Sequence, residues 1–186
     1  VTILSMNSNT EFLVVEMGMD RPGQLHELST LVSPDVTVIT MIGEAHIEFF
    51  KTRDRIADAK LEIIDGLRED GEFVFNGDEP LLVDRANKLK VNKKTFGKLT
   101  TNNIYPIKII DGDNTTKFTT NLLGEYNVFN ALAALEVGRL FEIKSQNMQL
   151  GLEHANLTKN RTEWIKGNQG EMILSDVYNS NPSAVK

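Results

Sequence analysis

Lys60 stands at a position where a helical pattern favours an apolar residue. Ile56, Lys60, Ile63 and Leu67 are spaced so that, in a helix, their side chains form one stripe. Such a stripe normally faces the core of a protein. A lysine on it has two explanations. Either its charge extends past the helix edge into water, or a partly desolvated amine is kept neutral for chemistry.

A second group of polar residues stands where apolar runs end. Glu16 ends "LVVE", Glu44 and His46 lie in "GEAHIE", and Asp176 ends "MILSD". In open α/β sheets ligands bind at the carboxyl ends of the strands. A Glu and a His at neighbouring strand ends could therefore share one hard cation with phosphate oxygens. Taken singly, such a Glu is also typical of a helix or turn cap, and such a His of a solvated surface group.

The helix that carries Lys60 follows the loop that carries His46, so we expect its inward stripe to return over the same sheet edge. Near a magnesium site, a neutral lysine amine can add carbon dioxide and become a carbamate. The side chain is then an anionic oxygen ligand instead of a repelled cation. A carbamate would explain why Lys60 lies on an apolar stripe.

The elements that would position these residues alternate between strands and helices. Residues 12–15 and 36–42 are apolar runs typical of strands buried on both faces of a parallel sheet, and Leu25, Leu28 and Leu31 lie between them at helical spacing. This alternation predicts an α/β fold with an open, mostly parallel sheet flanked by helices. The further elements expected are a helix at 53–67, a strand at 72–76, a helix at 81–89 and a strand at 93–97.

The pattern changes after residue 101. Two β-rich runs in residues 102–123 are separated by "DGDN", which indicates a small antiparallel hairpin. A helix follows in "NVFNALAALEVGRLF" with Asn127 as its N-cap, and a second helix is expected at residues 147–154. "TEWIKG" and "GEMILSD" indicate two strands around the turn "GNQG".

Composition is that of an ordinary globular protein. Of the 186 residues, 40% are hydrophobic and 25% are charged, with a formal net charge of −6. The basic run at residues 88–94 has no interleaved aromatic residues, so we expect a solvated turn and no nucleic-acid surface. No run of about 18 apolar residues is present, so we expect no membrane insertion. Zero cysteines fit a reducing compartment, and we expect a cytoplasmic protein.

Six segments occur together and in a characteristic order: "VVEMGM", "SPDVTVITMIGEAHIEFF", "RIADAKLEI", "LLGEYNVFNALAAL", "NRTEW" and "SDVYNSNPSA". By these segments the chain resembles the Mur ligases, the ATP-dependent amide-forming enzymes of peptidoglycan synthesis. Residues 100–121 are the least distinctive part. The resemblance implies the central ATP-binding domain of such a ligase, P-loop-like or Rossmann-like in fold, at residues 1–175. It also implies a hinge and the start of a C-terminal domain at residues 176–186.

The resemblance implies a metal role for three residues. Glu16 matches the acid that helps to hold the magnesium ion bridging the ATP phosphates. His46 matches a ligand of a second magnesium ion. Lys60 matches the lysine that is carbamylated in this family and contacts that second ion.

Three further residues would hold the nucleotide. Asn130 resembles the asparagine that contacts adenine, and Arg161 and Asp176 resemble the pair that holds the phosphate and the ribose. One departure lies close to this group. Glu125 and Tyr126 occupy positions where the family commonly has a basic residue and a histidine.

The Gly-rich phosphate loop of the family is missing from this sequence. "TFGKLT" at residues 95–100 does not supply it, because the motif needs a glycine five residues before Gly97 and Asn92 stands there. The backbone amides of that loop cradle the phosphates, so we expect this chain alone to bind ATP poorly. The first residue is Val1, not Met, and we expect the sequence to be part of a longer protein.

The segment "DVYNSNP" indicates the substrates within the family. It implies that ATP phosphorylates the terminal carboxylate of UDP-N-acetylmuramoyl-tripeptide and that the amine of D-alanyl-D-alanine attacks the acyl phosphate, in an enzyme that uses two magnesium ions. We expect a monomer. Two alternatives stay open: another ATP-dependent amide ligase of Mur or folylpolyglutamate type, and a degenerate module without catalysis.

Overall fold

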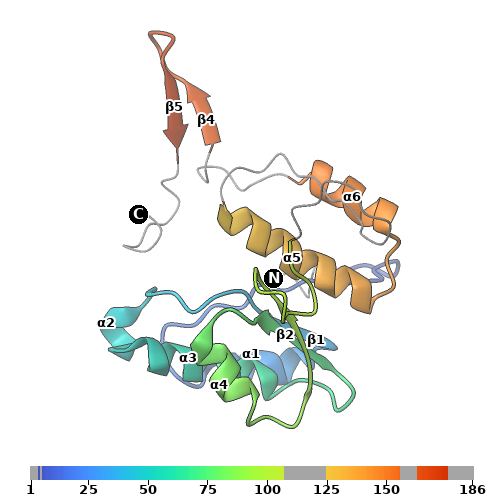
Figure 1. The fold of residues 1–186 in the computed structure, drawn as a ribbon. Helices are drawn as coiled ribbons and strands as arrows, with labels where there is room; N and C mark the ends of the chain where they lie inside the picture. The colour runs from blue at the N-terminus through green and yellow to red at the C-terminus, as the bar shows by residue number, and fades with distance from the viewer. Residues whose placement is uncertain (1–3, 5, 107–124, 156–162, 176–186) are drawn as a thin grey trace.

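Strands and helices alternate along the chain in the computed structural model, which describes residues 4, 6–106, 125–155 and 163–175 (Figure 1). The first part contains α1 (Gln24–Val32), β1 (Val36–Ile39), α2 (Ile47–Phe50), α3 (Arg53–Leu61), the 3-10 helix η2 (Glu62–Ile64), β2 (Glu72–Asn76), α4 (Pro80–Ala86) and β3 (Asn92–Phe96). The later elements are α5 (Glu125–Leu140), α6 (Ser145–Glu153), β4 (Glu163–Lys166) and β5 (Met172–Ser175).

The strands β1, β2 and β3 form a parallel sheet with β2 in the middle. In its register Val38 lies beside Val74, and Phe75 lies beside Thr95. Parallel neighbours need a crossover connection, which the helices between the strands supply. The predicted α/β fold with an open parallel sheet is confirmed, and β2 has the predicted bounds.

Helices cover both faces of this sheet (Figure 1). On one face, buried side chains of β1 and β2 pack against α3 and α4; they include Ile39, Phe73, Phe75, Ile56 and Leu82. On the other face, β2 and β3 pack against α5 through Val74, Phe96, Leu132 and Ala133. Because β2 is buried on both sides, its sequence is almost continuously apolar, as parallel strands usually are.

The first apolar run is not a strand. Residues 12–15 have no regular secondary structure, and the Phe12 and Val14 side chains are 56% and 90% exposed. The prediction of a buried strand there is wrong. A strand needs a hydrogen-bonded neighbour, and among the described residues β1 pairs with β2 alone. Phe12 instead lies edge-on to Phe141, with the ring centroids 5.2 Å apart.

The helix α1 is confirmed, but its buried face differs from the predicted leucine stripe. Leu25 is buried, whereas Leu28 and Leu31 are 38% and 75% exposed. Ser29 is buried instead, because the turn at Gly66 comes very close to it. A Cβ atom at Gly66 would overlap the carbonyl carbon and oxygen of Ser29.

The remaining predictions had different outcomes: some were confirmed with small shifts, the N-cap prediction is wrong, and part of the predicted hairpin lies outside the described residues. The helix predicted at 53–67 ends as α3 at Leu61 and continues as η2. Asn127 is not an N-cap, because α5 begins at Glu125 and Asn127 is buried within its first turn. Of the predicted hairpin at residues 102–123, residues 107–123 lie outside the described part. What is described there includes a parallel bridge between Phe96 and Ile104.

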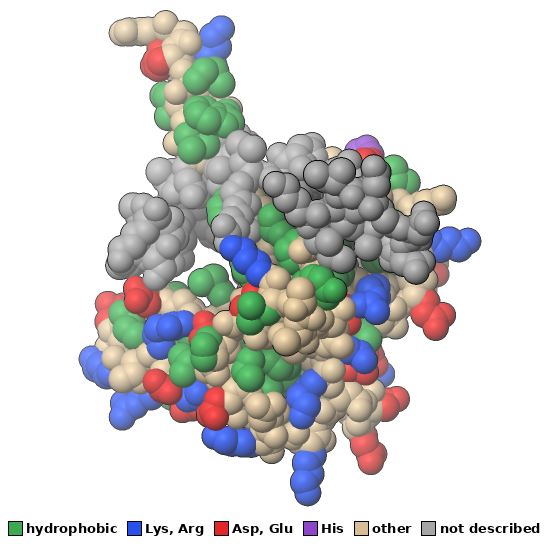
Figure 2. Space-filling model, viewed as in Figure 1, with side chains coloured by type: hydrophobic (Ala, Val, Ile, Leu, Met, Phe, Trp, Pro, Cys, Tyr) green, Lys and Arg blue, Asp and Glu red, His purple; other side chains and the backbone are tan. Residues whose placement is uncertain are grey.

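The strands β4 and β5 form the predicted antiparallel pair, which projects as a ribbon at the top of Figures 1 and 2. Hydrophobic side chains gather along this ribbon in the space-filling view (Figure 2). Those at least 40% exposed are Trp164, Ile165, Met172, Ile173 and Leu174. Among the described helices, none is both long enough and apolar enough to cross a lipid bilayer.

Candidate active site

The helix α3 brings the amine of Lys60 to the carboxyl end of β1. The helix begins after Thr52, whose hydroxyl accepts a hydrogen bond from the Arg55 amide over 3.2 Å. Ile56, one turn before Lys60, is buried in the core, as the predicted stripe requires. Lys60 Nζ donates a hydrogen bond to the Met41 carbonyl oxygen over 2.8 Å. The amine is therefore directed at the loop that follows β1.

Burial changes the acidity of this amine. Desolvation lowers the pKa of Lys60 below the ordinary lysine value, because removal of water penalises the charged form. A lower pKa leaves more of the amine neutral at a given pH. The neutral amine is the form that can act as a nucleophile.

His46 lies five residues after Met41, immediately before α2. Its backbone is left-handed, with φ 61° and ψ 20°, which is uncommon for a residue other than glycine. Its carbonyl accepts hydrogen bonds from the Phe49 and Phe50 amides over 2.9 and 3.2 Å. The imidazole is exposed, 6.4 Å from the Phe49 ring between centroids. An exposed imidazole after β1 is free to reach a bound ligand.

Glu16 lies in the irregular segment before α1, and its side chain is exposed. The strand expected to end at Glu16 is not formed. Over the described residues, no three His, Cys, Asp or Glu side chains gather closely enough to hold a metal ion. Lys60 thus contacts the loop that carries His46, at the Met41 carbonyl. Among the contacts of the described residues, none joins Glu16 to Lys60 or to His46.

Of the predicted nucleotide residues, Asn130 alone lies in the described part of the chain. It is exposed on α5, and its Nδ2 donates to Asn127 Oδ1 over 3.3 Å. The preceding residue, Phe129, has the Lys98 ammonium 5.6 Å above its ring centroid. Arg161 and Asp176 lie outside the described residues.

Sequence reasoning missed Arg53, the first residue of α3. Arg53 Nη2 donates to the Ile42 carbonyl oxygen over 2.9 Å and to Glu79 Oε2 over 2.7 Å. Arg53, Ile56 and Lys60 are three and four residues apart, so they share one side of the helix. That spacing indicates that Arg53 lies on the same side of the helix as Lys60. The sequence does not indicate its partner, because that partner is a backbone carbonyl.

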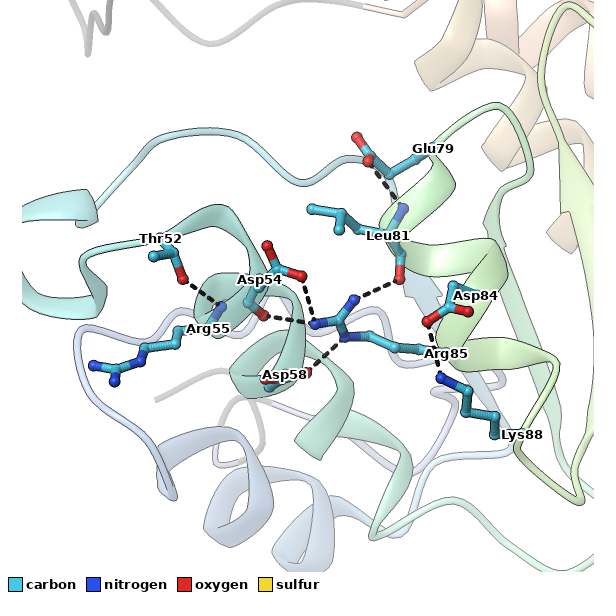
Figure 3. A network of polar contacts seen from close by, with 9 residues as sticks. All are labelled: Thr52, Asp54, Arg55, Asp58, Glu79, Leu81, Asp84, Arg85 and Lys88. Carbon is cyan, nitrogen blue, oxygen red and sulfur yellow. Dashed lines mark hydrogen bonds and ion pairs between the residues drawn. The ribbon is translucent and has the colours of Figure 1, made fainter.

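A separate network joins α3 to α4 (Figure 3). Arg85 of α4 donates to Asp58 Oδ1 over 2.6 Å and to Asp54 Oδ1 over 3.2 Å. Asp58 and Asp54 raise the pKa of Arg85 above its ordinary value. This network fixes the two helices to each other.

A cavity of about 600 Å³ lies beside α2 and α3. It is lined by residues 20–22, residues 48–51 and four side chains of α3 and η2, which are Arg55, Asp58, Ala59 and Glu62. Glu16, His46 and Lys60 do not line it. The cavity is therefore separate from the candidate site at the end of β1.

A parallel sheet with helices on both faces defines an α/β domain, a class of fold in which ligands bind at the carboxyl edge of the sheet. The family model of the Mur ligase middle domain matches residues 1–138. A UDP-N-acetylmuramoyl-tripeptide–D-alanyl-D-alanine ligase of Bacillus subtilis is 40% identical over 195 residues, which cover all of this chain and 42% of that protein. This chain belongs to the Mur ligase family, which confirms the resemblance.

Other relatives agree. A ligase of the same name from Buchnera aphidicola subsp. Baizongia pistaciae is 27% identical over all of this chain and 43% of that protein. MurF from Acinetobacter baumannii has a TM-score of 0.89 at 24% identity, covering 98% of this chain and 42% of that one. MurF ligase from Thermotoga maritima in complex with ADP has a TM-score of 0.69, and the match covers 89% of this chain and 40% of that one. The chain spans less than half the length of these relatives.

Proposed function

We propose that this chain is part of an ATP-dependent ligase that joins D-alanyl-D-alanine to UDP-N-acetylmuramoyl-tripeptide in peptidoglycan synthesis. The Bacillus subtilis relative, 40% identical over the whole chain, supports these substrates. The single structural observation that carries the proposal is the contact between Lys60 Nζ and the Met41 carbonyl, which directs a partly desolvated amine at the loop of His46. Nucleotide binding is supported by the Thermotoga maritima relative with ADP.

The neutral amine of Lys60 would react with carbon dioxide. A bond forms between Nζ and the carbon, one C–O π bond opens onto oxygen, and the nitrogen releases one proton. The product is an anionic carbamate that keeps one N–H, which can still donate to the Met41 carbonyl. This chemistry would turn a cation on an apolar stripe into a pair of oxygen donors.

The residues present fit magnesium in their chemistry. Magnesium prefers oxygen donors, keeps several waters, and is usually bound by one or two protein groups plus substrate phosphates. Glu16 and carbamylated Lys60 would offer oxygen donors, and His46 would offer an imidazole nitrogen. When bound, the two ions would neutralise the charge that gathers on phosphoryl and carboxyl oxygens.

The reaction then has two displacements. A carboxylate oxygen of the tripeptide attacks the γ-phosphorus, and ADP leaves. The amine of D-alanyl-D-alanine attacks the acyl phosphate carbon, phosphate leaves, and the amine loses a proton. Asn130 would contact the adenine, and Arg161 and Asp176 the phosphate and ribose. These side chains would hold and orient the reactants.

We also propose that residues 1–175 form the central domain and residues 176–186 a hinge to a further domain. The middle-domain match at residues 1–138 supports the first part of this division. We further propose a cytoplasmic enzyme, since the absence of cysteine fits a reducing compartment, and a monomer.

The decisive experiment measures phosphate release by the full-length protein with ATP, magnesium and UDP-N-acetylmuramoyl-tripeptide. We expect release with D-alanyl-D-alanine and only background release with single amino acids. Release driven by a single amino acid, or by a folate and glutamate, would replace this function with that of another amide ligase. Nucleotide binding without release under any condition would identify a module that does not catalyse.

A further inference from the structure

The loop between β1 and α2 carries His46 and has little backbone support of its own. The Met41 carbonyl accepts from Lys60 Nζ over 2.8 Å, and the Ile42 carbonyl accepts from Arg53 Nη2 over 2.9 Å. Within the described part of the chain, no other hydrogen bond reaches the backbone of residues 41–43. Two cationic side chains of α3 therefore hold two successive carbonyls of this loop.

Arg53 is itself held in place. Its Nη2 has two hydrogens, and the second is directed at Glu79 Oε2, 2.7 Å away. Glu79 is only 12% exposed, and its other oxygen accepts from the Leu81 amide at the start of α4. Charge-assisted hydrogen bonds in such partly desolvated places fix geometry well. Glu79 thus orients the guanidinium so that it points at the Ile42 carbonyl.

The proposed reaction modifies Lys60 and leaves Arg53 unmodified. Lys60 would lose its positive charge on carbamylation and would turn its new oxygens toward a metal ion. Arg53 forms no carbamate and presents a rigid planar donor. Its contact with the Ile42 carbonyl therefore does not depend on the modification of Lys60.

We propose that Arg53 is a positioning residue for the metal site. Fixed by Glu79, it holds the Ile42 carbonyl, and so keeps the loop and the His46 imidazole at the carboxyl end of β1 in both states of Lys60. The buried Ile42 side chain, 2% exposed, anchors the same residue in the core from the other side. This inference rests on the proposed function, because it assumes that His46 binds a metal ion.

Arg85 provides a matched control. It also links α3 and α4 through carboxylates, Asp54 and Asp58, and its side chain is more buried than that of Arg53, 17% against 45% exposed. It donates to the carbonyls of Leu81 and Asp54 but to none in residues 41–43. Loss of Arg85 should therefore cost at least as much stability as loss of Arg53 without releasing the loop.

The first test titrates magnesium in the phosphate-release assay of the full-length protein. Arg53→Ala should raise the magnesium concentration for half-maximal turnover by about tenfold, the lower end of the loss seen when an outer partner of a metal ligand is removed. Arg53→Lys should recover part of this, since a lysine keeps the charge but lacks the planar fork. Arg85→Ala should need no more magnesium than the parent. An equal requirement in Arg53→Ala and Arg85→Ala would overturn the inference.

The second test does not depend on turnover. In the full-length protein with ATP, manganese should broaden the His46 imidazole resonance, assigned with His46→Gln, and broaden it less in Arg53→Ala than in Arg85→Ala. Equal broadening in both variants would refute the role of Arg53 and leave the proposed function standing. A parent His46 signal that manganese does not broaden would refute the metal role of His46 and this inference with it, while phosphate release would still decide the proposed ligase function. If Arg53→Ala fails to fold, Glu79→Gln, which keeps the side-chain shape, should shift both readouts in the same direction by less.

Discussion

At Lys60, packing and chemistry place opposing demands on one side chain. The stem belongs to the stripe that α3 turns toward the sheet, while the amine reaches the Met41 carbonyl and is partly deprived of water. Burial of an ammonium group is costly unless a partner or a change of charge offsets it. One carbonyl is a modest partner for a cation. The remaining cost favours the neutral amine, which carbon dioxide can modify.

The first prediction at this scale concerns turnover. Lys60→Ala in the full-length enzyme should nearly abolish ligation, and added bicarbonate should not restore it, whereas removal of dissolved carbon dioxide should slow the parent. The reason is that alanine can neither form a carbamate nor hold a cation. Lys60→Arg is the control for charge, since it keeps a donor but forms no carbamate, and it should also be inactive. Near-parental turnover of Lys60→Ala would refute the proposal that Lys60 is carbamylated.

A second prediction concerns stability against pH. The pKa of Lys60 is lowered in the folded state, so the unfolded chain binds more protons over the alkaline range that ends near the ordinary lysine value of 10.5. Stability contributed by this residue should therefore rise with pH through that range and be lowest below it. The measurement compares denaturant unfolding of the parent and Lys60→Met at several alkaline pH values. If the free energies of unfolding of the two proteins change with pH in parallel, the lowered pKa of Lys60 is contradicted.

At the scale of elements, contacts between neighbouring segments decided which faces were buried. The close approach of α1 to the turn after η2 needs a small residue on each side, and Ser29 and Gly66 provide them. The Ser29 hydroxyl also donates to the Glu62 carbonyl and accepts from the Gly66 amide, both over 3.2 Å. This contact, more than the leucine stripe, sets the rotation of α1.

The third prediction tests that contact. Gly66→Ala would drive a Cβ atom into backbone atoms of Ser29, which cannot move aside as a side chain can. We expect a loss of about 2 kcal/mol or more in the free energy of unfolding, in the range for overpacked sites. Gly18→Ala is the matched control, because nothing lies within 4 Å of the place its Cβ atom would take, and it should change stability by less than about 0.5 kcal/mol. If both variants lose a similar free energy of unfolding, α1 and the turn at Gly66 can move apart to make room for a Cβ atom.

At the scale of the whole molecule, the sequence predicted what depends on local pattern. The strand β2 was placed correctly because burial on both faces makes it continuously apolar. Lys60 was singled out because its charge interrupts an apolar stripe, and its role as a site residue stays a prediction. Residues 12–15 were misjudged because a strand depends on a neighbour that lies elsewhere in the chain. Arg53 was missed because its partners, a carbonyl and a helix-capping glutamate, meet it only after folding.

The fourth prediction concerns nucleotide affinity. This chain contains no Gly-rich phosphate loop, so ATP bound to residues 1–186 would lack the backbone amides that cradle its phosphates. We expect the affinity of residues 1–186 for ATP to be at least about 100-fold below that of the full-length protein, which corresponds to roughly 2.7 kcal/mol. Isothermal titration calorimetry on both proteins measures this difference. Equal affinities would mean that the described helices and loops suffice for ATP.

The ribbon of β4 and β5 has a practical consequence. Trp164 is the single tryptophan of the chain, and its side chain is 53% exposed on that ribbon. Its indole emission is therefore an internal optical reporter, red-shifted while water surrounds it. Any segment or molecule that comes to cover the ribbon would shift that emission to the blue, without the need for a label.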